Sequence, residues 1–280
     1  MQKLAEFEAL IAVVTPNENA IQAFVEANTA FMPTPDIIGY HGLHLNSVIA
    51  KFPVGERSTD YAYLCKNSIE WRLVLVELED SSKRIFKPSS KNVAFTAEFS
   101  DAVAQIDVWR DYKTNHMDHL REKLRPLMVP PQMFRNKLSV RYLLVIGLSA
   151  ELEHDEKRRL RLANYGHDRD LRIITYDTIA REFRSSGGKA KAVLRANSRG
   201  YRLQSTEAMP SLMFSHILPE HLELSPEAEA DLRANQYDID AWTRNEPLIF
   251  NEKWTRRTVD ELQDKVNPVV KSLLGRVKDR

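Results

Sequence analysis

Cysteine is almost absent from this sequence of 280 residues. Cys65 is the single cysteine, so the chain cannot close an internal disulfide and cannot build a cysteine-rich zinc site. It lies within an apolar run, which favours a small buried side chain over a reactive nucleophile. Neither a disulfide scaffold nor a zinc ribbon is therefore expected.

The sequence also lacks an excess of either charge. Its 40 lysines and arginines nearly balance 39 aspartates and glutamates, which leaves a formal net charge of +1. Because no basic field covers the whole molecule, any contact with nucleic acid must come from local patches. Hydrophobic residues make up 43% of the chain and charged residues 28%, so it can bury a core as one large domain or two ordinary ones.

Long hydrophobic runs are missing too. No apolar stretch approaches the roughly 20 residues that span a bilayer. The N-terminus lacks the cationic start and long apolar segment of a signal peptide. Residues 185–189 (SSGGK) lack the glycine spacing of a phosphate-binding loop. We therefore expect a cytoplasmic globular protein without a membrane contact and without a nucleotide site at that loop.

The apolar periodicity predicts an α/β fold with a mixed central sheet flanked by helices. A β-α-β unit with a right-handed crossover is expected in its second half. We expect a core domain over residues 1–184, including the N-terminal helices, and a mostly helical C-terminal extension over residues 185–280. Strands are expected at residues 45–52, 61–65, 71–79, 140–146 and 171–175, and helices at residues 1–14, 17–31, 99–112 (extending toward 124), 150–164, 178–183, 226–243 and 257–277.

The predicted strand at residues 71–79 (WRLVLVELE) is the strongest in the chain and carries two carboxylates at its end. Side chains alternate across a sheet, so Glu77 and Glu79 share the face of the apolar residues that precede them. Asp60 opens the preceding strand, and Gln105 lies on the following helix. Carboxylate and amide oxygens so placed can hold a divalent metal ion.

Several motifs in this order resemble a known family. They are TDYAYL at 59–64, WRLVLVELE at 71–79 and AVAQIDVW at 102–109. NENAIQAF precedes them, and VRYLLVIG and RIITYDTIARE follow. Together they resemble the PD-(D/E)XK restriction-endonuclease-like fold and, more narrowly, the Shedu-type nucleases of bacterial anti-phage defence. The resemblance covers roughly residues 16 to 184, and the end of the chain does not add to it.

The resemblance implies roles for residues of the predicted centre. Asp60 and Glu77 would be ligands of Mg²⁺ or Mn²⁺. Glu18 would be a helix carboxylate near the metal, and Gln105 would be the helix glutamine that closes the site. The partners implied are DNA and further copies of the chain in a homo-oligomer.

One position departs from the family pattern. Glu79 stands where the family carries lysine, and a carboxylate cannot stabilise developing negative charge as an ammonium does. Glu79 can ligate metal or act as a base, while Lys83, four residues further on, could serve as a relocated lysine.

Three functions remain open from the sequence. The first is metal-dependent DNA endonuclease activity in antiviral defence. The second is a catalytically impaired DNA-binding or regulatory protein on the same fold, which the glutamate at position 79 favours. The third is an interaction or structural protein without a nucleic-acid role, which the balanced charge favours. Surface or hydrogen-bonded roles are expected for the histidine pairs, His41 with His44 and His116 with His119.

Overall fold

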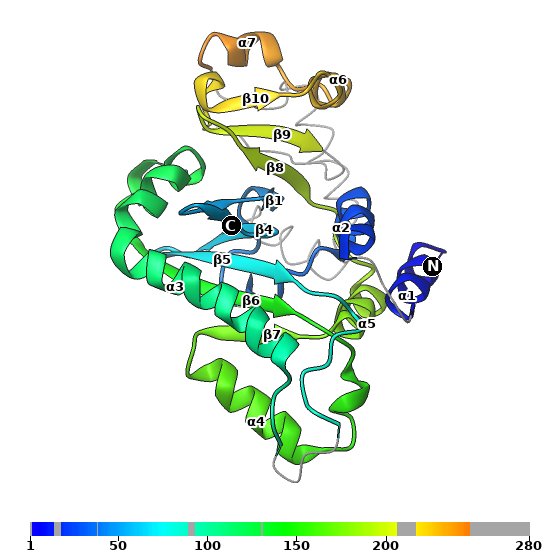
Figure 1. Ribbon diagram of the computed structural model, residues 1–280. Coiled ribbons are helices and arrows are strands. Elements are labelled where there is room, and N and C mark those ends of the chain that lie inside the picture. Colours follow the sequence, from blue (N-terminus) through cyan, green and yellow to red (C-terminus); the bar gives the residue numbers. More distant parts are fainter. Residues whose placement is uncertain are drawn as a thin grey trace, which may run out of the picture.

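A computed structural model describes residues 2–13, 18–37, 39–88, 93–129, 131–205 and 217–246. Within these residues, an eight-stranded mixed sheet forms the centre of the molecule (Figure 1). Its spatial order is β10-β9-β8-β1-β4-β5-β6-β7. The strands are β1 (Ser47–Ala50), β4 (Tyr61–Lys66), β5 (Glu70–Leu78), β6 (Lys137–Val145), β7 (Leu171–Ile174), β8 (Ala192–Ala196), β9 (Tyr201–Ser205) and β10 (Leu222–Leu224), and a separate small hairpin pairs β2 (Pro53–Val54) with β3 (Arg57–Ser58).

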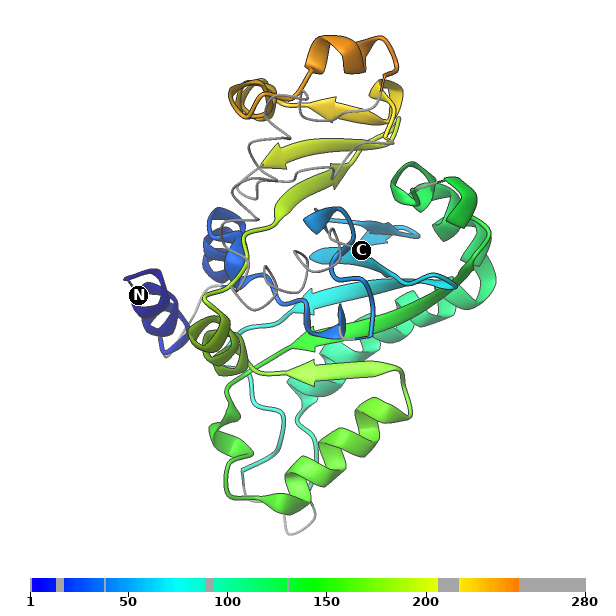
Figure 2. The same cartoon turned by 180° about the vertical axis from the view of Figure 1, so that it is seen from behind.

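Helices cover the sheet on both faces. One face packs against α3 (Ala97–Leu124) and α4 (Glu156–His167), and in Figure 1 α3 crosses in front of β5 and β6. The other face packs against α1 (Gln2–Ile11), α2 (Glu18–Ala27) and α5 (Tyr176–Ser186), which lie together in the reverse view of Figure 2. Two further helices, α6 (Pro226–Ala234) and α7 (Ile239–Thr243), accompany β9 and β10. Short 3-10 turns lie at Thr29–Phe31, Pro35–Ile37, His44–Asn46, Arg125–Leu127, Pro131–Met133, Ser149–Glu151 and Pro219–His221.

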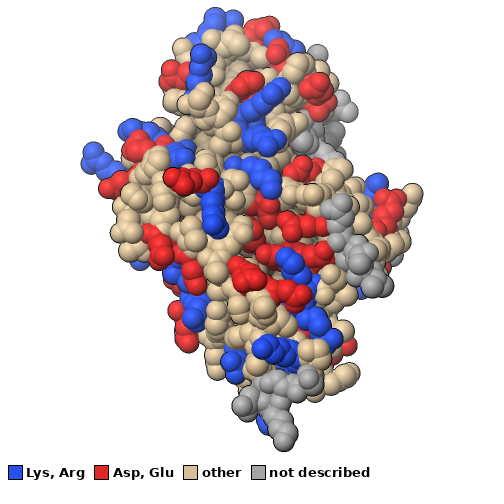
Figure 3. Space-filling view, in the orientation of Figure 1, with Lys and Arg blue, Asp and Glu red and all other residues tan. Residues whose placement is uncertain are grey.

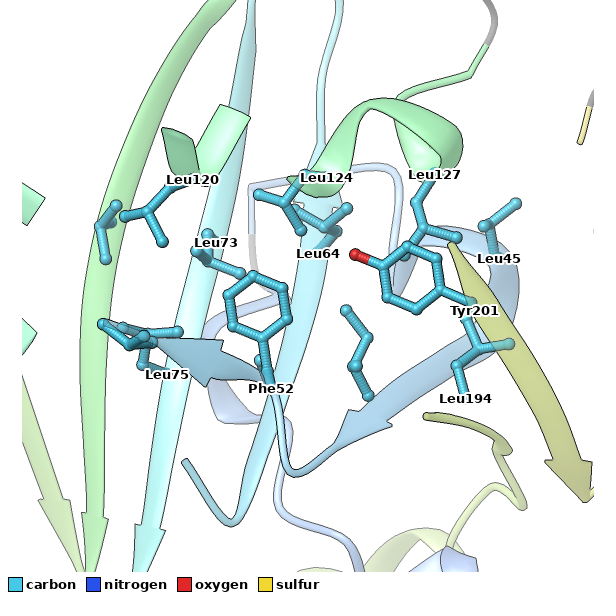
Figure 4. Packing of buried hydrophobic residues seen from close by; sticks show 14 of the residues in the cluster. Leu45, Phe52, Leu64, Leu73, Leu75, Leu120, Leu124, Leu127, Leu194 and Tyr201 are labelled. Atoms are coloured by element: carbon cyan, nitrogen blue, oxygen red, sulfur yellow. The ribbon is translucent and has the colours of Figure 1, made fainter. Parts of the chain in front are cut away.

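Two apolar cores lie on the two faces, because β5 is buried on both. Leu73 and Leu75 point into the core beneath α3, and Val74 and Val76 point into the core beneath α1, α2 and α5. Figure 4 shows the first core, where Leu73 and Leu75 lie near Phe52, and Tyr201 of β9 lies near Leu127. At about 25 cal/mol for each square ångström of apolar surface removed from water, such burial is the main stabilising term of the fold.

The strand register decides where the predicted centre lies. β4 and β5 are antiparallel and pair Tyr61 with Val76, so Asp60 and Glu77 occupy the neighbouring positions at the same end of the two strands. Asp60 shares the side-chain alternation of Ala62, and Glu77 that of Leu75. Both carboxylates therefore belong to the face of the sheet that α3 covers.

The long helix α3 begins at a side-chain cap and ends near the far end of the sheet. The hydroxyl of Thr96 accepts a hydrogen bond of 3.1 Å from the backbone N–H of Phe99, which satisfies one of the free donors of the first turn. The helix runs to Leu124 with a kink at His116. The predicted extension toward residue 124 is thus confirmed.

The β-α-β unit is also confirmed, since β6 and β7 are parallel neighbours joined through α4. The helix begins later than the sequence pattern indicated. Asp155 caps it by accepting a hydrogen bond of 3.0 Å from the backbone N–H of Arg158. Glu151 consequently lies before α4, in a 3-10 turn, and is available for another contact.

The expectation of a mostly helical extension after residue 184 is wrong at residues 192–196, 201–205 and 222–224. These segments form β8, β9 and β10, and β8 joins the central sheet by parallel pairing with β1, with Ser47 opposite Ala192. The strands are only three to five residues long, too short for a clear alternation of polar and apolar residues. The helix expected at residues 226–243 is present as α6 and α7. The helix expected at 257–277 lies outside the described residues, and the domain boundary at 184 stays a prediction.

A buried carboxylate cluster at the strand ends

Four carboxylates lie within electrostatic reach of one another where β4, β5 and α2 meet. We call Glu18, Asp60, Glu77 and Glu79 the acidic cluster. Glu18 is the first residue of α2, while Asp60, Glu77 and Glu79 are only 7%, 7% and 8% exposed. Figure 3 shows acidic side chains gathered in the middle of this face, with basic side chains above and below them. Buried carboxylates of like charge repel one another unless protons or cations neutralise them.

Asp60 is held by both of its oxygens. One accepts a hydrogen bond of 2.8 Å from the backbone N–H of Leu78, and the other accepts one of 2.7 Å from the ammonium of Lys51. The first contact ties the start of β4 to the end of β5. The second supplies a counter-charge to a carboxylate that is nearly buried.

Glu77 is the least satisfied member of the acidic cluster. Its Oε1 accepts a hydrogen bond from the Gln105 side chain of α3, whereas its buried Oε2 has no partner among the described residues. Burial, followed by the charges of Asp60 and Glu79, raises the pKa of Glu77 to about 9, and Lys51 opposes this rise. Glu77 therefore holds a proton near neutral pH unless a cation replaces it.

Glu79 follows the last residue of β5 and is fixed on its backbone and its side chain. Its N–H donates to the carbonyl of Val145 at 2.8 Å, and its own carbonyl accepts a hydrogen bond of 2.6 Å from the buried hydroxyl of Tyr176. Its carboxylate pairs with Lys83. Burial lowers the pKa of Lys83, but the hydrogen bond and charge of Glu79 outweigh burial, so the pKa lies above its usual value.

The loop that carries Lys83 is fastened by residues that the sequence analysis did not select. The two carboxylate oxygens of Glu151 accept hydrogen bonds from the backbone N–H groups of Ile85 and Phe86, at 2.7 and 2.9 Å. Gly147 lies so close that a Cβ there would be 2.5 Å from the carbonyl oxygen of Lys83. The sequence signal for Gly147 was its place directly after an apolar strand.

Glu18 reaches the acidic cluster from the N-terminus of α2. Burial raises its pKa, and the charges of Asp60 and Glu79 raise it further. The structure thus brings together every residue that the sequence analysis placed at the centre. It adds Lys51, which follows β1 directly and was missed because its proximity to Asp60 depends on the pairing of β1 with β4.

The carboxylates of the acidic cluster suit a hard cation, but two of them are paired with lysines: Asp60 with Lys51 and Glu79 with Lys83. Carboxylate oxygens are the ligands that Mg²⁺ and Mn²⁺ prefer, and the buried Oε2 of Glu77, which has no hydrogen-bond partner in the described part of the chain, could bind a cation in place of a proton. As the side chains are arranged, no three or more His, Cys, Asp or Glu residues in the described part of the chain are grouped so as to hold a metal ion. Binding one would require Asp60 or Glu79 to release its lysine.

The histidine pairs take no part in this site. His44 is buried, bonds the carbonyl of Leu127 at 2.7 Å and packs edge-on against Trp71. Burial lowers the pKa of His44 to about 4. His116 and His119 are exposed on α3, where His119 bonds the hydroxyl of Tyr112. His41 is exposed as well, so the expectation of surface or hydrogen-bonded histidines is confirmed for all four.

The fold and the site define a mixed α/β protein with a buried carboxylate cluster at its strand ends, flanked by two lysines. Residues 16–179 match the family model described as Shedu protein SduA, C-terminal. That match covers more than half of the chain, so the protein belongs to the Shedu family, and membership suggests a role in anti-phage defence. No curated protein matches the chain. Among the described residues, no helix is long and apolar enough to cross a bilayer.

Proposed function

We propose that this protein is a metal-dependent DNA endonuclease of the Shedu type, built on a PD-(D/E)XK core and acting against invading DNA in the cytoplasm. The observation that carries the proposal is the buried Oε2 of Glu77, which has no partner among the described residues. It lies on the same face of the sheet as Asp60, at the same end of the two strands. A buried acceptor next to further carboxylates is what a cation would satisfy.

The proposed cation is Mg²⁺ or Mn²⁺, held by Asp60, Glu77 and Glu79 with Glu18 beside them. Such an ion polarises a phosphoryl oxygen and lowers the pKa of a bound water. Gln105 orients Glu77 through its hydrogen bond, so that one carboxylate oxygen stays directed into the cluster. Net hydrolysis adds water across one phosphorus–oxygen ester bond, leaving a phosphate monoester on one product and a hydroxyl on the other.

Lys83, which the sequence suggested as a relocated lysine, acts in this proposal through its contact with Glu79. Its ammonium neutralises Glu79 and adds positive charge to the rim of a cluster that would otherwise repel a DNA phosphate. Glu151 supports this role because it fixes the backbone of the loop. A lysine on a fixed backbone loses little conformational entropy when it binds a phosphate.

The direct experiment is cleavage of supercoiled plasmid by the purified full chain with Mg²⁺ or Mn²⁺. We expect metal-dependent conversion to nicked or linear DNA, and a loss of at least about 100-fold for Glu77→Ala. Exposed Glu56→Ala, in the turn between β2 and β3, is the matched control. Intact plasmid with the parent protein, or cleavage by Glu77→Ala at the parental rate, would refute the nuclease.

A second function has its own supporting observation. The pairing of Asp60 with Lys51 and of Glu79 with Lys83 neutralises two carboxylates without a metal. A catalytically impaired protein that binds DNA and regulates other components would need only this arrangement. Retention of DNA in a gel shift without metal-dependent cutting would favour this reading. The homo-oligomer implied by the family resemblance is proposed for either function and is measurable by light scattering.

A further inference from the structure

Lys51 contacts Asp60 through both its backbone and its side chain. Its N–H donates to the carbonyl of Asp60 at 2.9 Å, and its ammonium donates to Oδ1 of Asp60 at 2.7 Å. The Lys51 side chain is 37% exposed, whereas that of Asp60 is 9% exposed. The Lys51 side chain therefore lies between solvent and the buried acidic cluster.

The backbone of Lys51 adopts a conformation that lysine seldom occupies. Its φ of 49° lies in the left-handed region, which is strained for a residue with a side chain. Such strain persists where the surroundings fix it, and it concentrates at functional sites. Here the strained residue directly follows β1 and directs its side chain onto Asp60.

A row of side chains on α2 holds the Lys51 ammonium from its other side. The ammonium donates to Oε1 of Gln22 at 3.3 Å. The Gln22 amide in turn donates to Glu26 at 3.2 Å, and the same Glu26 oxygen accepts a hydrogen bond of 3.3 Å from the hydroxyl of Tyr61. Lys51 is thus positioned by a second element, as a group with a defined task would be.

The two lysines differ in the carboxylates they serve. Lys83 pairs with Glu79 four residues before it in the same loop. Lys51 pairs with Asp60, one of the proposed cation ligands, and its charge also acts on Glu77 at the centre of the acidic cluster. Once Asp60 serves as a cation ligand, the Lys51 ammonium needs another anion, and the proposed substrate offers a phosphate oxygen.

We propose that Lys51 is the catalytic ammonium that contacts the DNA phosphate, that Gln22 is its positioning residue, and that Lys83 remains with Glu79. This assignment rests on the proposed DNA substrate. Lys51 forms no covalent bond in it; its charge offsets the negative charge that grows on the phosphoryl oxygens as water attacks phosphorus. Lys51, which directly follows β1, thereby supplies the positive charge that position 79 lacks.

The test compares Lys51→Gln, Gln22→Ala, Lys83→Gln and Lys137→Gln in the full chain. Lys137 is an exposed control at the other end of β5 and β6, opposite Glu70 in the strand register. Three quantities are measured: Mn²⁺ affinity without DNA, affinity for a short duplex in Ca²⁺, and the Mg²⁺-dependent cleavage rate. Lys51→Arg serves as the conservative variant.

We expect Lys51→Gln to bind Mn²⁺ at least as tightly as the parent, because Asp60 loses a competing ammonium. It should bind the duplex about tenfold more weakly and cleave at least about 100-fold more slowly, with partial rescue by Lys51→Arg. Gln22→Ala should show smaller losses in the same direction, and Lys83→Gln should retain duplex affinity within about threefold. Mn²⁺ and duplex affinities that fall together, with loss of folded protein, would mean that Lys51 is only structural and would overturn the assignment.

The outcomes also separate this assignment from the nuclease itself. If the parent cleaves and Lys51→Gln matches it in duplex affinity and rate, the role of Lys51 is refuted while the nuclease stands. If the parent does not cleave but Lys51→Gln loses duplex affinity relative to Lys137→Gln, the nuclease is refuted and the phosphate contact stands. A parent that neither binds nor cleaves DNA refutes both.

Discussion

The carboxylate of Asp60 accepts a hydrogen bond of 2.8 Å from the backbone N–H of Leu78, which joins the start of β4 to the end of β5. This contact keeps Asp60 at the side of Glu77 even though the two residues are separated by a turn and most of two strands. The same side chain also receives the Lys51 ammonium. Asp60 is therefore a structural tie between strands as well as a proposed cation ligand.

Replacing Asp60 should consequently cost stability. Asp60→Ala leaves the N–H of Leu78 and the Lys51 ammonium without their acceptor, and we expect it to lower the free energy of unfolding by about 1–3 kcal/mol. Asp60→Asn keeps an acceptor for Leu78 and should cost less. Urea denaturation followed by circular dichroism measures both. Asp101→Ala, an exposed site on α3, controls for loss of an aspartate, and a loss for Asp60→Ala no larger than for this control would contradict the contact.

Glu77 should make stability depend on pH. Its pKa is about 9 in the folded protein against 4.5 as the ordinary value, so the folded state binds more protons between these two values. Its contribution is thus present in full below pH 4.5 and is lost as pH rises toward 9. We expect Glu77→Gln to lessen the fall in unfolding free energy between pH 6 and pH 8 by about 2 kcal/mol.

Chemical denaturation at a series of pH values measures this difference, with metal ions removed by chelator. Glu56→Gln, in an exposed turn, should follow the parent curve. Parallel curves for the parent and Glu77→Gln would show that Glu77 is ionised in the folded state, contrary to the burial described here.

Gly147 should resist substitution because of its neighbour as well as its backbone. Gly147 and Gly187 both have positive φ, at 64° and 72°, but a Cβ at Gly147 would meet the Lys83 carbonyl at 2.5 Å, whereas one at Gly187 would meet nothing within 4 Å. Both alanine variants should lose about 1 kcal/mol from backbone strain. Gly147→Ala should lose more stability than Gly187→Ala, as measured by thermal unfolding. Equal losses would mean that the loop of Lys83 moves aside without an energetic cost.

Glu151 should control the mobility of that loop. Glu151→Ala frees the N–H groups of Ile85 and Phe86, so their amide hydrogens should exchange with solvent at least about tenfold faster. Hydrogen–deuterium exchange resolves this segment from the rest of the chain. The exposed neighbour Glu153→Ala is the control, and protection that is unchanged in Glu151→Ala would refute the fastening.

Much of the fold followed from local pattern in the sequence. The continuous apolar run of β6 and the alternation in β5 identify central strands, and the placement of Glu77 at a strand end follows from that alternation alone. The convergence of Asp60 with Glu77 was likewise expected, and the antiparallel register confirms it. These features depend on residues close in sequence or on adjacent strands.

The missed features depend on pairing between distant segments. Lys51 reaches Asp60 because β1 pairs with β4, and β8 is a strand between two others, β1 and β9. Glu151 binds a loop more than 60 residues before it in the chain. Single-sequence periodicity carries no information about such contacts, whereas a strand of five residues gains its stability largely from the neighbour it joins.

The central claim, that the acidic cluster is a cation site, is tested most directly by anomalous scattering from crystals soaked in Mn²⁺. We predict a peak within coordination distance of the carboxylates of Asp60 and Glu77, with the Lys51 ammonium moved off Oδ1 of Asp60, and no such peak in Glu77→Ala crystals. Density without a peak at these carboxylates, in crystals whose Asp60 still binds Lys51, would contradict the account.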